Sequence, residues 1–162
     1  MRPFKEYVRQ GLDKISDLPL KTVCPSHGPI LRADICSYLD KYRQWAAEPP
    51  KSDRKRLLVC YASAYGNTAG MAAAIARGAE SAGAEASIID LAAADIDAIL
   101  DDVERCDAIA VGSCTINGDA VDRVWTLFSS LATIKVKGKV AAAFGSFGWS
   151  GEGPNMMTER MR

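Results

Sequence analysis

A short stretch after an apolar run has the residue types of a phosphate-binding loop. Ser63–Thr68, of sequence Ser-Ala-Tyr-Gly-Asn-Thr, follows the apolar residues 57–62 and precedes the alanine-rich residues 69–82. A strand, a tight loop and a helix direct backbone N–H groups and the positive end of the helix dipole toward an anion. The hydroxyls of Ser63 and Thr68 and the side-chain amide of Asn67 add donors, and the loop contains no Lys or Arg. The stretch therefore indicates a terminal phosphate held by neutral donors.

Two common nucleotide motifs do not describe this loop. A Walker A loop needs Gly-Lys-Ser/Thr, and a dinucleotide fingerprint needs three spaced glycines; neither pattern occurs here. The alternative interpretation is a tight strand-to-helix turn in which Thr68 caps the helix, because Ser and Thr are good capping residues in any protein.

Two later stretches have compositions that suit a ligand. The first is Cys114–Asp119, and the second is Gly145–Gly153, in which two aromatic residues lie among four glycines and two serines. Glycines let the backbone approach a ligand closely, and an aromatic side chain can stack on a planar ring. The alternative is a glycine-rich surface loop whose aromatic residues cover the end of a sheet.

The elements that must position these stretches alternate along the chain. Apolar runs predict strands at 57–62, 85–91, 107–113 and 140–144, and helical periodicity predicts helices at 69–82, 94–104, 120–132 and from 154 onward. In the helix 69–82, the residues spaced to pack on a sheet are Met71, Ala74, Ile75 and Ala79. Short connections between alternating strands and helices imply right-handed crossovers and a parallel sheet. The three stretches then leave the carboxyl ends of strands and converge on one crevice.

The first third of the chain has a different organisation. Helices are predicted at 3–15 and 33–47, with a possible strand at 20–23, and the polar, proline-containing residues 49–56 predict a linker. His27, the only histidine, lies in the loop Cys24–Arg32. A metal site needs three or four ligands, and this segment offers no second histidine, so a local hydrogen-bonding role is the simpler interpretation.

Composition limits the classes of partner. The 162 residues carry 20 basic and 20 acidic side chains, a balance that predicts no nucleic-acid or anionic-membrane surface. No apolar run has the length of a membrane span, and the N-terminus lacks an apolar signal core. Five cysteines without a CxxC pair or a disulfide spacing favour a reducing, cytoplasmic location.

Taken together, the motifs resemble the flavodiiron proteins. Cys-Pro-Ser-His-Gly-Pro-Ile-Leu-Arg, a helix, a linker and a flavodoxin-type loop are similar to the junction in that family between a metallo-β-lactamase-like domain and a flavodoxin-like domain. The resemblance implies an α/β fold, a flavodoxin-like three-layer α/β/α sandwich with four of its five parallel strands present. It also implies a C-terminal remnant of the metallo-β-lactamase-like domain at 1–48, a linker at 49–56 and a C-terminally truncated FMN domain at 57–162.

The resemblance also assigns site residues. Cys114 stands where the family usually has proline, which predicts a less rigid turn beside the cofactor. The residues that match the family's FMN-binding loops are Ser63, Ala64, Tyr65, Gly66, Asn67, Thr68, Thr115, Ile116, Asn117, Gly118, Gly145, Ser146, Phe147, Gly148, Trp149 and Gly151. His27 matches an iron-ligating histidine, whose partner ligands would come only from a full-length parent.

The implied function is electron transfer through FMN from a reduced donor, such as rubredoxin or a flavin reductase, to a diiron site outside this chain. In a full-length parent that site reduces oxygen or nitric oxide, and the family forms a head-to-tail dimer. By itself the chain is expected to bind flavin without reductase turnover. The alternatives are a flavodoxin-like NAD(P)H:quinone reductase, for which no nicotinamide motif is visible, and a cofactor-free fragment or interaction domain.

Overall fold

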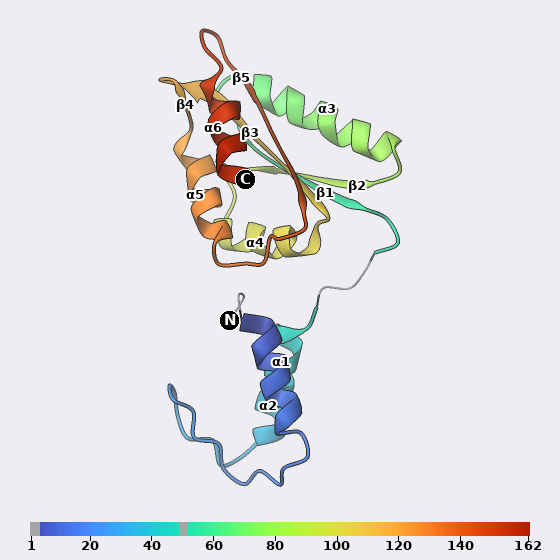
Figure 1. The fold of residues 1–162 in the computed structure, drawn as a ribbon, viewed down its shortest axis with the longest axis vertical. Coiled ribbons are helices and arrows are strands. Elements are labelled where there is room, and N and C mark those ends of the chain that lie inside the picture. The colour runs from blue at the N-terminus through green and yellow to red at the C-terminus, as the bar shows by residue number, and fades with distance from the viewer. Residues whose placement is uncertain (1–3, 49–51) are drawn as a thin grey trace. The chain divides into compact units, whose positions relative to one another are not determined.

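Residues 4–48 and 52–162 are described by a computed structural model (Figure 1), and the chain divides into two units, Met1–Pro49 and Pro50–Arg162. The first unit contains α1 (Lys5–Lys14) and α2 (Ile35–Ala46). The second unit contains β1 (Arg56–Ala62), α3 (Asn67–Ser81), β2 (Glu85–Asp90), α4 (Ile96–Arg105), β3 (Ala108–Ile116), β4 (Asp119–Ala120), α5 (Asp122–Leu131), β5 (Val140–Ser146) and α6 (Glu152–Met161).

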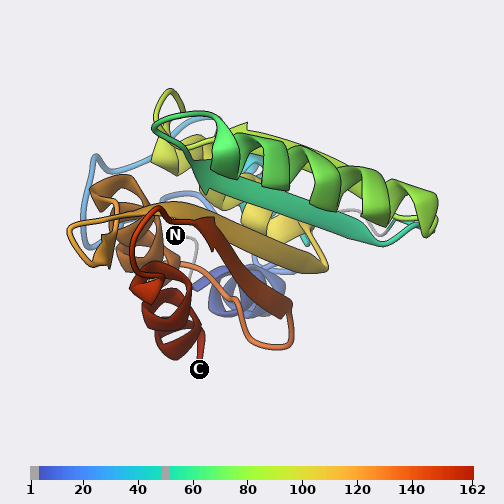
Figure 2. The same cartoon turned by 90° about the horizontal axis from the view of Figure 1, so that it is seen from above.

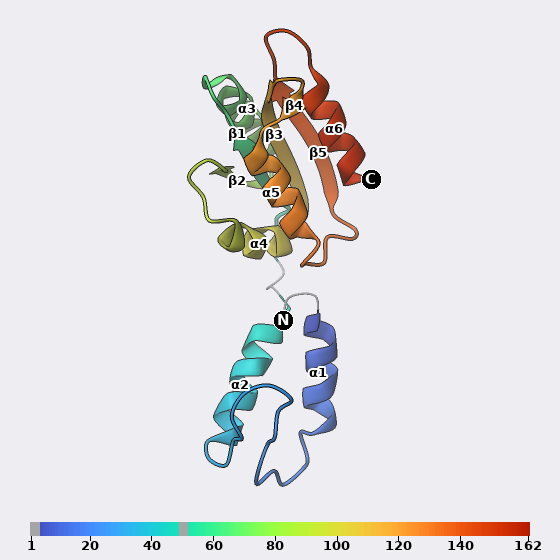
Figure 3. The same ribbon diagram turned by 90° about the vertical axis from the view of Figure 1, so that its left-hand side faces the viewer.

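The first unit is a helical hairpin, in which α1 and α2 lie side by side (Figure 3). Its interior is small, with Leu12 and Ile35 among its buried side chains. Arg9 closes the end of α2, because its guanidinium donates to the Ala46 carbonyl at 2.6 Å and to the Glu48 carboxylate at 2.5 Å. The predicted strand at 20–23 is wrong: only one antiparallel bridge, Val23 to Leu31, forms between the helices.

The second unit is built on a parallel sheet in the order β2-β1-β3-β5. The central strands β1 and β3 are the apolar runs, and most of their side chains are buried. Such strands are expected in a sheet covered on both faces. The predicted flavodoxin-like fold with four parallel strands is therefore confirmed, and two helices precede it in the chain.

Helices cover both faces of this sheet (Figure 2). On one face, α4, α5 and α6 enclose a large core whose fully buried members include Leu58, Leu91, Leu100, Leu127 and Met157. On the other face, α3 packs on a small core of Val59, Ala72, Ala76 and Ala110. The two cores thus differ greatly in size.

The buried face of α3 differs from the predicted one. The helix starts at Asn67 and buries Thr68, Ala72 and Ala76, whereas Met71 is 38% exposed. The alanines let the helix lie close to the sheet, and the longer Met71 side chain lies at its flank. Of the predicted stripe, Ile75 packs against the small core and Ala79 is half-buried, whereas Met71 and Ala74 are exposed. The prediction is thus right at two positions and wrong at two.

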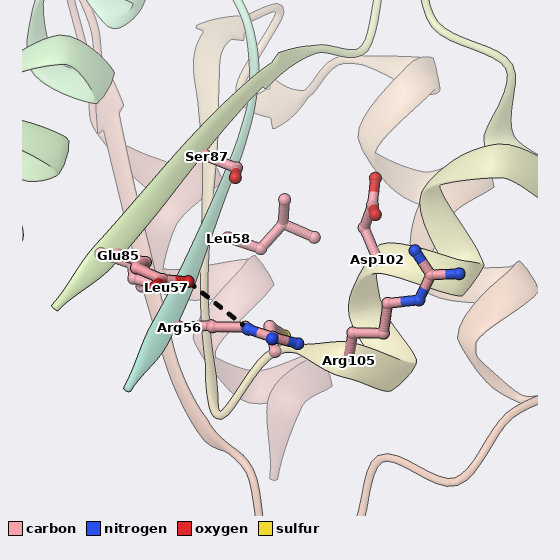
Figure 4. Close-up of a pocket in the computed structure, with 8 residues that line it drawn as sticks. Arg56, Leu57, Leu58, Glu85, Ser87, Asp102 and Arg105 are labelled. Atoms are coloured by element: carbon pink, nitrogen blue, oxygen red, sulfur yellow. Dashed lines mark ion pairs between the residues drawn. The ribbon is translucent and has the colours of Figure 1, made fainter. Parts of the chain in front are cut away.

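The amino ends of β1 and β2 border a cavity of about 460 Å³ (Figure 4). Charged side chains of both signs line it, and Arg56 and Glu85 form an ion pair at 3.6 Å. The cavity lies at the opposite end of the strands from the three stretches predicted to bind a ligand.

Two of the cysteines pack as small hydrophobic residues. Cys60 and Cys106 are buried in the large core. Burial raises the pKa of the Cys60 thiol to about 12, so the reactive thiolate is scarce at neutral pH. Separately, no helix in the described part of the chain is long and apolar enough to cross a bilayer.

Asp107 links the start of β3 to the start of β1 and gives the fold a pH dependence. Its carboxylate accepts from the Arg56 backbone N–H at 2.9 Å and from Lys55 Nζ at 3.1 Å. These two hydrogen bonds, the backbone one first, hold the pKa of Asp107 below its ordinary value. A carboxyl group whose pKa is lowered by folding stabilises the folded state when the pH is above its pKa in the unfolded chain. This stabilisation is lost as the pH falls through the lowered pKa of the folded state.

We therefore expect Asp107→Asn to lower the urea midpoint at pH 7, with the difference from wild type shrinking as the pH falls below about 4. Asp53→Asn is the matched control, because it removes an exposed carboxylate close to the same strand end. An Asp107→Asn defect of equal size at pH 7 and pH 3 would contradict this assignment. Urea titrations monitored by circular dichroism at several pH values make the comparison.

Candidate functional site

Three segments meet at the carboxyl ends of β1, β3 and β5, which lie side by side. In the sheet, Ala62 of β1 pairs with Ser113 of β3, and Ser113 pairs with Gly145 of β5. The loop after β1, the end of β3 and the segment after β5 therefore occupy one end of the sheet, at the top of the second unit in Figure 1. We call this the candidate site; the convergence predicted from the sequence is present in the fold.

The loop after β1 leads into the exposed N-terminus of α3. Gly66 precedes the helix with φ of +84°, a conformation that glycine adopts readily, and no side chain caps the helix. The first N–H groups of a helix lack partners within it, so this end can accept an anion. Tyr65 is 92% exposed beside it, and Ala64 and Asn67 are exposed as well.

Thr68 does not have the capping role considered above. It is the second residue of α3, it is 0% exposed, and its Oγ1 lies 2.8 Å from Ser146 Oγ at the end of β5. The capping hypothesis is therefore wrong for Thr68, and the hydroxyl joins two of the three segments instead.

The segment Cys114–Asp119 is part of a β-hairpin and not a loop. β3 continues to Ile116, and Thr115 pairs with Ala120 of β4. Asn117 and Gly118 form the two-residue turn with φ of +54° and +76°. Positive φ at both positions is typical of a type I′ hairpin turn, which Asn-Gly favours.

Polar side chains outside the predicted set hold this hairpin. Ser113 is fully buried, and its Oγ donates to the Cys114 carbonyl at 2.8 Å and accepts from Val121 N–H at 3.0 Å. Asp119 Oδ1 accepts from the Ala120 N–H at 2.6 Å and from Trp125 Nε1 at 3.1 Å. An acidic residue directly after Asn-Gly is the sequence signal that could have identified Asp119.

The segment after β5 presents two aromatic side chains differently. A Cβ on Gly151 would lie 2.7 Å from the Phe147 ring, so this glycine makes room for Phe147. Phe147 is 59% exposed, whereas Trp149 is 97% exposed and projects freely. A Cβ on Gly153, in the first turn of α6, would lie 2.8 Å from Thr115 Oγ1, so α6 packs tightly on the hairpin.

Two buried hydroxyls at this end of the sheet have no hydrogen-bond partner among the described residues. They are Ser63 Oγ, directly after β1, and Thr115 Oγ1, on β3. An unsatisfied buried polar atom costs about 1–3 kcal/mol and calls for an explanation. A ligand at this end of β1 that accepts from Ser63 would remove the cost there, whereas Thr115 Oγ1 lies against Gly153 of α6.

The candidate site fits FMN in its donors and its surfaces. The uncapped start of α3 and the Ser63 hydroxyl suit a phosphate. Trp149 and Phe147 offer exposed aromatic surface. The sequence segments 63–68, 113–118 and 145–151 contain no Lys or Arg, so attraction for the phosphate comes from neutral donors and the helix dipole.

His27 is exposed in the loop between α1 and α2 of the first unit. Within residues 4–48 and 52–162, no group of three or more His, Cys, Asp or Glu side chains is arranged to hold a metal ion.

Comparisons with known proteins agree with this geometry. The flavodoxin family model matches residues 59–162. The type A flavoprotein fprA of Rhodobacter capsulatus is 43% identical over all of this chain, which covers 38% of that protein. The flavo-diiron protein FprA2 of Clostridium acetobutylicum is 38% identical over 99% of the chain and 41% of its own length. The chain thus spans well under half of either relative.

Solved structures show the same fold. Rubredoxin oxygen:oxidoreductase from Desulfovibrio gigas is 26% identical with a TM-score of 0.75, over 99% of this chain and 40% of that one. A flavodoxin from the domain Archaea is 38% identical with a TM-score of 0.57, over 66% of this chain and 73% of that one.

Proposed function

The chain belongs to the flavodoxin family, and from this premise we propose that it binds FMN at the candidate site and serves as an electron-transfer module. The observation that carries the proposal is the buried, unpartnered hydroxyl of Ser63, directly after β1 and beside the uncapped start of α3.

Each segment of the site has a distinct task in this proposal. The start of α3, Asn67 and the Ser63 hydroxyl hold the phosphate. The glycine backbones at 118 and 145–151 would donate to the polar edge of the ring system, and Trp149 would shield its face from water. Bound FMN supplies one-electron redox chemistry, and the protein tunes it through these hydrogen bonds and through shielding from water.

The wider role rests on the relatives. Because the chain resembles part of flavo-diiron proteins, we propose that 1–48 is the end of a metallo-β-lactamase-like domain, 49–56 a linker and 57–162 the FMN domain. In a longer polypeptide, His27 would then ligate iron, and electrons would reach a diiron site that reduces oxygen or nitric oxide. The donor would be rubredoxin or a flavin reductase, in a cytoplasmic head-to-tail dimer. The names of two relatives, a flavo-diiron protein and a rubredoxin oxygen:oxidoreductase, support this assignment.

Retention of FMN tests the proposal directly. The purified chain is mixed with FMN and desalted, and its visible spectrum and flavin fluorescence are recorded. We expect retained FMN absorbance with quenched fluorescence. FMN that appears entirely in the wash would contradict the proposal, and NADPH oxidation by the flavin-loaded chain would favour the quinone-reductase alternative.

Ser63→Ala is expected to separate ligand binding from stability. Removing the hydroxyl should weaken FMN binding about tenfold, because a hydrogen bond to a charged group is lost. The flavin-free protein should be as stable as wild type or more stable, because an unsatisfied buried group disappears. Fluorescence titration and thermal melting measure the two effects.

Ser81→Ala is the matched control, since its hydroxyl bonds the Arg77 carbonyl at the far end of the same helix. It should leave FMN affinity unchanged. Equal FMN affinities for Ser63→Ala and Ser81→Ala would remove Ser63 from the phosphate site.

A further inference from the structure

The hairpin of β3 and β4 is short, and its tip is exposed. β4 has two residues, and two residue pairs join it to β3. The turn residues Asn117 and Gly118 between the strands are exposed, and both have positive φ. A two-stranded ribbon is marginally stable in water by itself. The position of the turn therefore depends on contacts that the hairpin makes with the rest of the fold.

Asp119, the residue directly after this turn, makes such a contact. Its Oδ1 accepts from the Ala120 N–H of its own strand at 2.6 Å and from Trp125 Nε1 of α5 at 3.1 Å. The same indole N–H also donates to the Ala120 carbonyl at 3.1 Å. Hydrogen bonds to an ionised acceptor are stronger than those between neutral groups. One carboxylate thus ties the strand that leaves the turn to a helix.

Trp125 is a firm anchor for this bond. Its ring packs against the large core, and its centroid lies 5.8 Å from that of the buried Phe128 ring. A tryptophan packed in this way usually directs its N–H to an acceptor. Because packing holds the indole, its bond to Asp119 fixes the hairpin relative to α5.

We infer that Asp119 is a positioning residue for flavin binding: through Trp125 it fixes the backbone at Gly118, which the proposed function places against the polar edge of the ring system. This inference rests on the proposed FMN function. Gly118 has a φ of +76° and no side chain of its own to hold it, so the residue that follows it must fix its N–H. Ser63 and the start of α3 serve the phosphate, whereas Asp119 serves the ring.

Riboflavin, which lacks the phosphate, shows at which end of the ligand a defect arises. Asp119→Ala removes the acceptor and should weaken FMN and riboflavin by the same factor. We expect about fivefold, as for the loss of one net hydrogen bond. Ser63→Ala is the contrasting variant, and it should weaken FMN more than riboflavin. Fluorescence titrations with the two flavins make the comparison.

Two further variants separate the hydrogen bond from the negative charge. Asp119→Asn keeps a side-chain oxygen that can accept from the indole, so it should restore most of the affinity for both flavins. Asp122→Ala is the matched control, because it removes an exposed carboxylate from the first turn of α5, close to Asp119 in the chain. It should leave both affinities unchanged.

The bond is also measured on the flavin-free chain. Trp125→Phe keeps an aromatic ring and removes the N–H. In urea denaturation, Asp119→Ala and Trp125→Phe should be non-additive, because both remove the same bond. The Trp125→Phe defect should be the larger one, since the bond to the Ala120 carbonyl is lost as well.

Four results would overturn the inference: wild-type affinity of Asp119→Ala for both flavins, a defect confined to FMN, an Asp119→Asn variant as weak as Asp119→Ala, or additive effects in the flavin-free cycle. A wild-type chain that binds neither flavin is a separate result. It would refute the proposed function and the positioning role with it, whereas non-additivity would still show that Asp119 and Trp125 hold the hairpin.

Discussion

Gly145→Ala is expected to destabilise the second unit by about 3 kcal/mol, at the upper end of the range for overpacking. A Cβ at this position would lie 2.2 Å from the Ser113 carbonyl oxygen and 3.0 Å from Pro154 Cγ. The carbonyl belongs to the neighbouring strand, which pairs with β5 at this residue. A backbone atom cannot move aside as the end of a flexible side chain can, so β3 and β5 must separate locally.

The same variant should also lose FMN affinity, because β5 carries the aromatic segment. Gly148→Ala is the matched control: it makes the same change three residues later, where a Cβ would meet nothing within 4 Å. It should alter stability by less than about 0.5 kcal/mol. Urea denaturation of the flavin-free chains gives both values, and equal midpoints for the two variants would show that the strands tolerate a methyl group at Gly145.

Trp149→Ala should reduce FMN affinity by about ten- to a hundredfold while leaving the flavin-free protein as stable as wild type. An aromatic side chain stacked on a planar ring contributes about 1–3 kcal/mol. Trp149 is almost fully exposed, so its removal takes little from the core. This combination, a large binding defect without a stability defect, is the signature of a side chain whose main contact is the ligand.

Trp45→Ala tests whether any exposed tryptophan would behave in this way. Trp45 lies on α2, is largely exposed, and contacts the Tyr42 ring edge-on. Its removal should leave FMN affinity unchanged. Fluorescence titrations of the three proteins make the comparison, and wild-type affinity in Trp149→Ala would transfer the stacking role to Phe147.

The sequence predicts the strands and helices that position the site, because local hydrophobic patterns determine these elements. The apolar runs of β1 and β3 and the helical periodicity of α4 can be identified in the sequence without tertiary information. In the structure, Ile99, Leu100 and Val103 form the buried face of α4. Parallel crossovers then place the three segments at one end of the sheet.

The hairpin was missed although its signal was present. Asn117-Gly118 lies between Thr115-Ile116 and Asp119-Ala120, and an Asn-Gly pair between such residues predicts a type I′ turn. The sequence analysis instead assigns Asn117 and Gly118 as ligand contacts, and it ends the strand at 113, three residues before the end of β3.

The Thr68–Ser146 contact could not have been predicted. Nothing local distinguishes a threonine that caps a helix from one whose hydroxyl reaches a strand 78 residues away. The burial of Ser113 could not have been predicted either, because the backbone N–H of Val121, which its hydroxyl accepts from, comes near only when the hairpin forms.

The unequal cores described above have a consequence for motion. α3 is held by the small core of Val59, Ala72, Ala76 and Ala110, which offers far less apolar contact than the large core on the opposite face. Local unfolding follows the region with the least buried apolar surface, so hydrogen exchange should reach α3 before α4 and α5. The helix that opens first is the one whose terminus forms the phosphate end of the site. Local unfolding of α3 would then also disrupt the phosphate end of the site and release the cofactor.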